Sequence, residues 1–347
     1  MRFSFFLYQI FAIVLLVLSL DFFVGENFLK SERDDAREYH DIFGMNLKPN
    51  ITKTYQFSNS DPPGEPVMFC TDQNAFRFLC NGKNESFNET LHDIIFIGDS
   101  IVESTGVSFE DSFSGLFQKK YNKKIINMGV NGYGFENSYT KINFFLKNGL
   151  QTKKLFLFVT SVNDFNQFNN EYKIITENKI PKTIILENYN SRKNNNNFKK
   201  KLRELFPLTY VNLWKIKSFF FPIEKNIVNN NLENLKNINY VNFEKSNEGL
   251  IFLNKFNQLS EEFNFEMYFV IFPTPGQYFI DNTAFIKTME NFCVSKKCKL
   301  INLFEDFFSV SYKEDGPNSY KNLFLPNDDH FNIKGHRLVA ESVHDKL

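Results

Sequence analysis

The stretch that decides the fold is His92-Asp93-Ile94-Ile95-Phe96-Ile97-Gly98-Asp99-Ser100-Ile101-Val102-Glu103-Ser104. Its consecutive β-favouring apolar residues, Ile94 to Ile97, predict a short strand that is buried on both faces, as in a parallel sheet. Gly98 permits the tight turn that ends this strand. Ser100 then lies at the carboxyl end of a buried strand, where open α/β sheets bind their ligands. The position favours Ser100 as a nucleophile, although Gly-Asp-Ser alone is equally typical of a simple turn.

The same pattern of a strand, a loop and a helix repeats along the chain. A short strand over 124–128 is followed by glycines, and an apolar strand over 155–160 runs into Ser161-Val162-Asn163-Asp164. Further strands are predicted over 267–272 and 299–304, and helices over 113–121 (with Asp111 as N-cap), 139–146, 250–263 and 285–292. This rhythm predicts a parallel sheet with right-handed crossovers, so the ends of the first three strands meet at one edge.

Two residues at that edge are candidates for stabilising negative charge. Gly129 has no side chain to shield its backbone N–H from a ligand oxygen. The carboxamide of Asn163 can donate a hydrogen bond to a developing oxyanion. Both residue types are also common in ordinary turns.

The segment from Leu325 to His336 contains a candidate general base. His330 precedes a helix that Asn332 is expected to cap, and the carboxylates of Asp328 and Asp329 come directly before it. A general base needs such a neighbouring acid, which fixes the imidazole tautomer and stabilises its charged form. A lone loop histidine would be an ordinary surface residue.

In this order, the motifs resemble those of the SGNH/GDSL hydrolase superfamily. They are Gly98-Asp99-Ser100, Asn127-Met128-Gly129, Val162-Asn163-Asp164 and Asp328-Asp329-His330. The resemblance covers residues 92–338 and implies an α/β fold, a three-layer α/β/α flavodoxin-like sandwich with a five-stranded parallel sheet. It implies Ser100 as the nucleophile and His330 as the general base, with no metal or other cofactor. The implied oxyanion hole consists of the N–H groups of Ser100 and Gly129 and the side chain of Asn163.

Two positions depart from the family pattern. The third motif usually opens with glycine, and Ser161 at that position is expected to change the shape of the loop without changing the chemistry. The acid often stands three residues before the histidine, where this chain has Asn327. Because members with Asp-x-His also exist, Asp328 is the expected acid and Asp329 the second choice.

The first residues predict a membrane anchor. The run from Phe3 to Leu20 is almost wholly apolar, with Arg2 before it and Asp21 after it. A helix of ~18 residues spans about 27 Å, close to the hydrocarbon thickness of a bilayer. The poor cleavage site favours an uncleaved signal anchor over a cleaved signal peptide. Arg2 favours a cytoplasmic N-terminus, with the remaining chain outside the membrane, on the periplasmic side if the source is bacterial.

Composition and cysteine spacing add two constraints. The formal net charge is zero, so electrostatics offers no argument for a nucleic-acid partner. The four cysteines form two local pairs, Cys70 with Cys80 and Cys293 with Cys298. Two disulfides are permitted in an exported domain, with four free buried thiols as the alternative. Neither pair has further ligands at zinc-site spacing.

The chain therefore divides into three predicted parts. Residues 1–24 form the transmembrane signal anchor, residues 25–90 a stalk and irregular N-terminal extension, and residues 91–347 the hydrolase-like domain. Within the last part, a helical insertion over about 165–250 is expected to cover the catalytic edge. Its basic run over 192–203 is expected to be either a solvated surface or a patch for anionic glycan or phospholipid headgroups.

Together these features predict a serine esterase that removes an acyl group, with acetyl favoured, from an extracytoplasmic glycan or lipid. One alternative is an O-acyltransferase to an envelope polysaccharide, in which a sugar hydroxyl replaces water. Because the chain has a single long apolar run, a separate membrane protein would then deliver the acyl donor. Another alternative is a non-catalytic envelope binding module.

Overall fold

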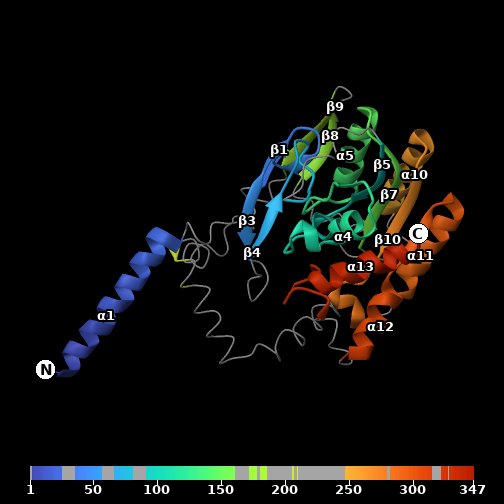
Figure 1. Cartoon of the computed structure of the whole chain (residues 1–347). Coiled ribbons are helices and arrows are strands. Elements are labelled where there is room, and N and C mark those ends of the chain that lie inside the picture. Colours follow the sequence, from blue (N-terminus) through green and yellow to red (C-terminus); the bar gives the residue numbers. More distant parts are fainter. Residues whose placement is uncertain are drawn as a thin grey trace.

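The computed structural model describes residues 2–25, 36–56, 66–80, 91–160, 172–177, 180–185, 205–206, 209, 247–279, 282–314, 322–326 and 328–347. Within them, a five-stranded parallel sheet forms the centre of the molecule (Figure 1). Its strands are β5 (Leu91–Ile97), β6 (Ile125–Asn127), β7 (Gln151–Val159), β10 (Glu266–Ile271) and β11 (Lys299–Asn302). The spatial order β11-β10-β7-β5-β6 is the flavodoxin-like order 2-1-3-4-5 read from the opposite edge. The predicted five-stranded parallel sheet is confirmed.

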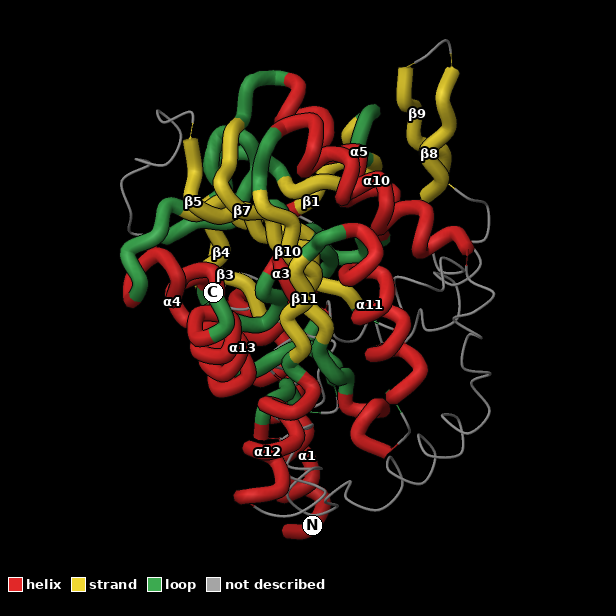
Figure 2. The backbone as a smooth tube through the Cα atoms, turned by 90° about the vertical axis from the view of Figure 1, so that its right-hand side faces the viewer, coloured by secondary structure: helices red, strands yellow, loops and turns green. Residues whose placement is uncertain are grey.

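Helices cover both faces of this sheet, as Figure 2 shows. One face packs against α4 (Phe113–Lys120), α12 (Phe304–Glu314) and α13 (Ile333–Asp345). The other packs against α5 (Phe135–Lys147), α10 (Asn247–Phe263) and α11 (Thr283–Lys296). The result is a three-layer α/β/α arrangement.

The side chains of β5 explain why both faces must be covered. Ile95 and Ile97 point into the core beneath α5 and α10, whereas Ile94 and Phe96 point toward α4 and α13. All are at most 2% exposed. Each such side chain contributes about 1.5–3 kcal/mol by leaving water. The continuous apolar run is therefore the signature of a strand with two buried faces.

The N-terminal extension is more regular than predicted. It contains two antiparallel hairpins, β1 (Arg37–His40) with β2 (Gly44–Leu47) and β3 (Thr52–Gln56) with β4 (Pro66–Cys70). Beyond β4, the backbone N–H of Arg77 donates to the carbonyl of Asn127 at 3.3 Å, which covers part of the β6 edge. The cysteines form the two local disulfides, Cys70–Cys80 within the extension and Cys293–Cys298 between α11 and β11.

The predicted insertion also differs from expectation in its described part. β8 (Tyr172–Glu177) and β9 (Ile180–Ile185) form an antiparallel hairpin where helices were predicted. The β-branched residues Ile174, Ile175 and Thr176 favour an extended backbone, which the Asn- and Lys-rich composition obscured. Most of the range 165–250, including the basic run 192–203, lies outside the described residues.

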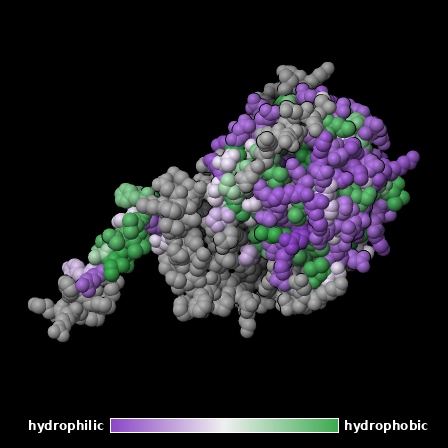
Figure 3. Space-filling model, viewed as in Figure 1, coloured by the Kyte–Doolittle hydropathy of each residue, from purple (hydrophilic) through white to green (hydrophobic). Residues whose placement is uncertain are grey.

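Helix α1 (Arg2–Leu20) forms where the N-terminal apolar run predicted a helix, followed by a π-helical turn at Asp21–Gly25. The predicted transmembrane helix is not found, because none of the helices, judged on their described residues, is long and apolar enough to cross a bilayer. On the face shown in Figure 3, hydrophilic residues cover most of the domain that holds the sheet, whereas the visible part of α1 is largely apolar.

The predicted helix caps had different outcomes. Asn332 caps α13, as expected, because its side chain accepts the backbone N–H of Gly335 at 3.1 Å. Asp111 does not cap α4; it ends a 3₁₀ turn at Phe109–Asp111. The next residue, Ser112, is the cap, and its hydroxyl accepts the N–H of Gly115 at 3.1 Å.

Candidate active site

Ser100 lies where the strand pattern predicted, at the carboxyl end of β5. It is partly exposed and begins α3 (Ser100–Glu103). The side chain of Asp99 caps this short helix by accepting the N–H of Ile101 at 2.9 Å. Gly98 has a φ of +155° in the left-handed half of the backbone map, and a Cβ there would come within 2.8 Å of Val102 Cγ2. Glycine is therefore required for the turn that exposes Ser100.

His330 lies in a loop whose backbone is fixed on both sides. The N–H of Leu325 donates to the carbonyl of His330 at 2.8 Å, and Phe324 pairs with Phe331 in an isolated bridge. The carboxamide of Asn332 reaches back across the loop and donates to the carbonyl of Phe324 at 3.0 Å. Asn332 thus caps α13 and closes the loop that carries His330.

The structure distinguishes the two carboxylates beside His330. Oδ1 of Asp328 accepts hydrogen bonds from Nδ1 of the imidazole and from the backbone N–H of the same histidine. The Asp328 side chain is 9% exposed, whereas the Asp329 side chain is 57% exposed and its Oδ1 lies 3.4 Å from Nδ1. A proton held on Nδ1 by Asp328 leaves Nε2 as the basic nitrogen.

Asp99, the residue directly before the candidate nucleophile Ser100, has a perturbed pKa. Burial raises the pKa of the Asp99 carboxyl to about 6, and its hydrogen bond from Ile101 and the charge of His330 oppose that increase. The ring of Phe331, next to His330, lies 5.2 Å from that of Phe272, the residue after β10, so the His330 loop lies at the carboxyl end of this strand. Ser100 lies at the carboxyl end of the parallel strand β5.

Gly129 does not have the role that the sequence predicted. Its N–H donates to Oδ1 of Asn127 at 3.0 Å and is not open to a ligand. A Cβ at Gly129 would lie 2.2 Å from the backbone nitrogen of Glu103 and 2.4 Å from the carbonyl carbon of Val102. The glycine is required because α3 packs directly against the loop after β6.

Gly132, in the same loop, is the glycine with open surroundings. The N–H of Tyr133 donates to the carbonyl of Val130 at 3.1 Å, and Gly132 has a φ of +84°, which together define a turn of type II. A Cβ at Gly132 would meet nothing within 4 Å. Its N–H makes no hydrogen bond to any residue that the structure describes. Gly132 thus replaces Gly129 as the candidate backbone donor.

The remaining predicted donor cannot be placed. Asn163 lies outside the described residues, as do Ser161 and Asn327, the two positions at which the sequence departs from the family pattern. The role of Asn163 therefore stays a prediction.

Sequence reasoning missed the buried ionic groups behind Ser100. Glu103 is fully buried and contacts Arg37 of the extension, and Arg77 donates to the carbonyl of Glu103 at 2.8 Å. Lys141 of α5 is also fully buried, and its ammonium donates to Oδ1 of Asn46 at 2.9 Å. Burial lowers the pKa of Lys141 to about 7, against the opposing charges of Asp72 and Glu103. These contacts join residues far apart in the sequence, so no local pattern indicated them.

The potential ligands for a metal ion lie at the same His330 loop. Asp328, Asp329 and His330 each offer one atom, and these atoms lie within 4.8 Å of one another. Nδ1 of His330 already contacts Asp328, so the geometry suits a paired general base.

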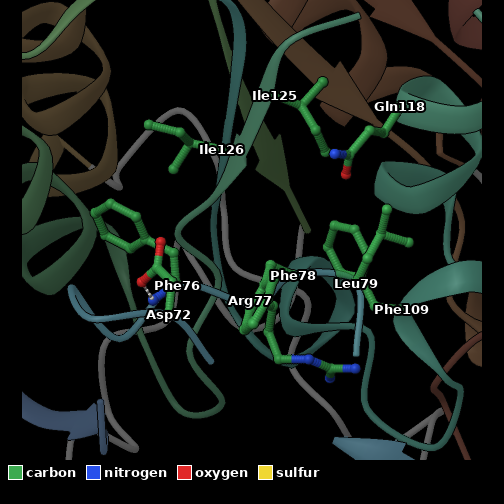
Figure 4. A pocket seen from close by; sticks show the side chains of 9 residues that line it. All are labelled: Asp72, Phe76, Arg77, Phe78, Leu79, Phe109, Gln118, Ile125 and Ile126. Atoms are coloured by element: carbon green, nitrogen blue, oxygen red, sulfur yellow. Dashed lines mark hydrogen bonds between the residues drawn. The ribbon is translucent and has the colours of Figure 1, made fainter. Parts of the chain in front are cut away.

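A cavity between the extension and β6 lies elsewhere (Figure 4). Arg77, Leu79, Phe109, Gln118 and Ile125 are among its lining residues, and none of the predicted catalytic residues lines it. Its volume of about 20 Å³ has room for a single water molecule.

No protein-family model and no curated protein matches the sequence. Solved structures resemble the fold. A lipolytic protein of the G-D-S-L family from Desulfitobacterium hafniense DCB-2 is 12% identical, covering 75% of this chain and 100% of its own, with a TM-score of 0.41. The acetyl xylan esterase AlAXEase is 15% identical, covering 74% and 99%, with a TM-score of 0.40. Axe2, an acetylxylan esterase from Geobacillus stearothermophilus, is 10% identical, covering 74% and 93%, with a TM-score of 0.38.

Proposed function

We propose that this protein is a serine esterase of the SGNH type. The observation that carries the proposal is the pairing of His330 Nδ1 with the largely buried carboxylate of Asp328, which fixes Nε2 as the basic nitrogen. Nucleophilic acyl transfer requires a serine and a histidine of fixed tautomer that can take its proton, and these are the roles proposed for Ser100 and His330.

The proposed reaction has two steps. Ser100 Oγ attacks the ester carbonyl, its proton moves to Nε2 of His330, and that proton then leaves with the alcohol as the C–O bond breaks. Water, deprotonated by the same nitrogen, then attacks the carbonyl carbon of the acyl-serine. The bond from that carbon to Ser100 Oγ breaks, the proton on Nε2 returns to Oγ, and the acid is released. The backbone N–H groups of Ser100 and Gly132 and the side chain of Asn163 are the proposed donors to the tetrahedral oxyanion.

The proposed substrate is an acyl ester, with acetyl as the first candidate, on an extracytoplasmic glycan or lipid. The two disulfides support an oxidising compartment, because cytoplasmic thiols are kept reduced. Release of acetate from isolated envelope glycans by the purified protein tests this assignment. Transfer to a sugar hydroxyl in place of water would identify an O-acyltransferase.

Hydrolysis of p-nitrophenyl acetate by the full-length protein tests the reaction type. The wild-type protein is expected to turn over, and the Ser100→Ala and His330→Ala variants to lose at least about 10³-fold in kcat. Glu341→Gln is the matched control, because Glu341 forms an exposed ion pair with Lys120 away from the site. Equal rates for wild type and Ser100→Ala would reject the proposal and leave a binding module.

A further inference from the structure

The carboxylate of Glu103 joins three separate parts of the molecule. It belongs to α3, three residues after Ser100, and its side chain is 1% exposed. Arg37 Nη2 donates to both oxygens, at 2.9 Å to Oε1 and 2.8 Å to Oε2. The backbone N–H of Asn131 donates to Oε2 at 2.5 Å. Thr105 Oγ1 donates to Oε1 at 3.3 Å.

The contact with Asn131 fixes the turn that presents Gly132. Asn131 is the residue directly before Gly132 in the turn from Val130 to Tyr133. One carboxylate therefore links the helix that begins with Ser100 to the turn that carries the open N–H. Oxyanion stabilisation depends on the separation of such donors, because they act at hydrogen-bond distance from the developing charge.

A buried carboxylate is stable only with a compensating partner. Arg37 supplies that charge from β1 of the extension and is itself largely buried, with 12% of its side chain exposed. Arg77 of the same extension donates to the Glu103 carbonyl at 2.8 Å and stacks on Phe69 at 4.0 Å. The extension therefore holds α3 through both the side chain and the backbone of Glu103.

We propose that Glu103 is a positioning residue for the oxyanion donors and that Arg37 holds its carboxylate in place. The described residues of the extension, 36–56 and 66–80, then form part of the catalytic unit and are more than a stalk. This inference rests on the proposed esterase function.

The charge-neutral variant Glu103→Gln tests the carboxylate. Its NH₂ group replaces one carboxylate oxygen and cannot accept a hydrogen bond, so one of the two Arg37 contacts is lost in either orientation of the amide, and with it either the Asn131 or the Thr105 contact. The negative charge that pairs with Arg37 is removed in both orientations. Hydrogen exchange of the peptide containing residues 130–133 is expected to accelerate at least tenfold in the native protein. The rate at which a fluorophosphonate modifies Ser100 is expected to fall about 10- to 100-fold, because the phosphoryl oxygen occupies the oxyanion position.

Variants at Arg37 separate positioning from general destabilisation. Arg37→Met is expected to slow labelling as Glu103→Gln does. Arg37→Lys is expected to restore the rate to within about threefold, since both contacts come from one nitrogen that an ammonium can replace. Asn137→Ala is the control: it removes a buried contact between α5 and the extension, Nδ2 to the Phe43 carbonyl at 2.9 Å, without touching α3. Its labelling rate is expected to match wild type.

The outcomes distinguish this inference from the proposed function. If wild type reacts while Glu103→Gln reacts equally fast with unchanged exchange at 130–133, the positioning role is wrong and the esterase stands. Equal slowing by Asn137→Ala would also overturn it, because any loosening of the extension would then suffice. A wild-type protein in which Ser100 never reacts would reject the esterase and the inference together.

Discussion

Asp99 offers a test of the site that needs no substrate. It is 8% exposed and caps α3 through the N–H of Ile101. The substitution Asp99→Asn keeps the shape of the side chain and the accepting oxygen, but removes the ionisable group. Its effect on stability should therefore report the burial of a charge beside Ser100.

The magnitude follows from the pKa. Burial raises the pKa of Asp99 from 3.8 to about 6. Below pH 3.8 the carboxyl is protonated in both states and the shift has no effect on stability. Between pH 3.8 and about 6 the native state holds the proton more tightly, so stability falls as pH rises. Above that window the full penalty remains, about 3 kcal/mol at ~1.36 kcal/mol per pKa unit.

Urea denaturation at pH 4 and pH 8 measures this effect. Asp99→Asn is expected to be up to about 3 kcal/mol more stable than wild type at pH 8 and nearly equal to it at pH 4. Asp345→Asn, at an exposed position near the end of α13, is the control and should change little at either pH. A difference between Asp99→Asn and wild type that is the same at both pH values would refute the buried, ionisable Asp99.

Further predictions concern the acid, the loop glycines and the buried lysine. Asp328→Asn should lower kcat for p-nitrophenyl acetate by about 10³- to 10⁴-fold, and Asp329→Asn by less than about threefold, because its carboxylate is exposed. Gly129→Ala should prevent soluble expression, since its Cβ would lie 2.2 Å from a backbone nitrogen of α3. Gly132→Ala should cost only about 1 kcal/mol in thermal unfolding, from its positive φ. Wild-type stability should rise from about pH 7 to pH 10, where the unfolded chain holds the proton that native Lys141 has lost. The Lys141→Met variant should show no such rise in stability when urea denaturation is measured between about pH 7 and pH 10.

The sheet was predictable because its signal is local. Runs such as Ile94 to Ile97 and Leu155 to Val159 can bury both faces only as central strands, and the structure has them as β5 and β7. Ser100 followed from its position after such a run. The β8–β9 hairpin was missed because charged and amide residues surround its β-branched residues.

The supporting residues were not predictable from local patterns. Arg37 and Glu103 are 66 residues apart, and their pairing depends on how the extension packs against α3. The role of Gly129 was assigned wrongly for a related reason. Sequence showed a glycine after a strand, but only the tertiary structure shows that Asn127 occupies its N–H and that α3 fills the space beside it.

Covalent labelling of the full-length protein by a fluorophosphonate, followed by peptide mapping, tests the central claim most directly. The reagent forms a bond from serine Oγ to phosphorus and releases fluoride, and only an activated serine reacts efficiently. The account predicts one modified residue, Ser100, and loss of the label in His330→Ala while the fold is retained. A label on another serine, or labelling of Ser100 that persists without His330, would contradict it.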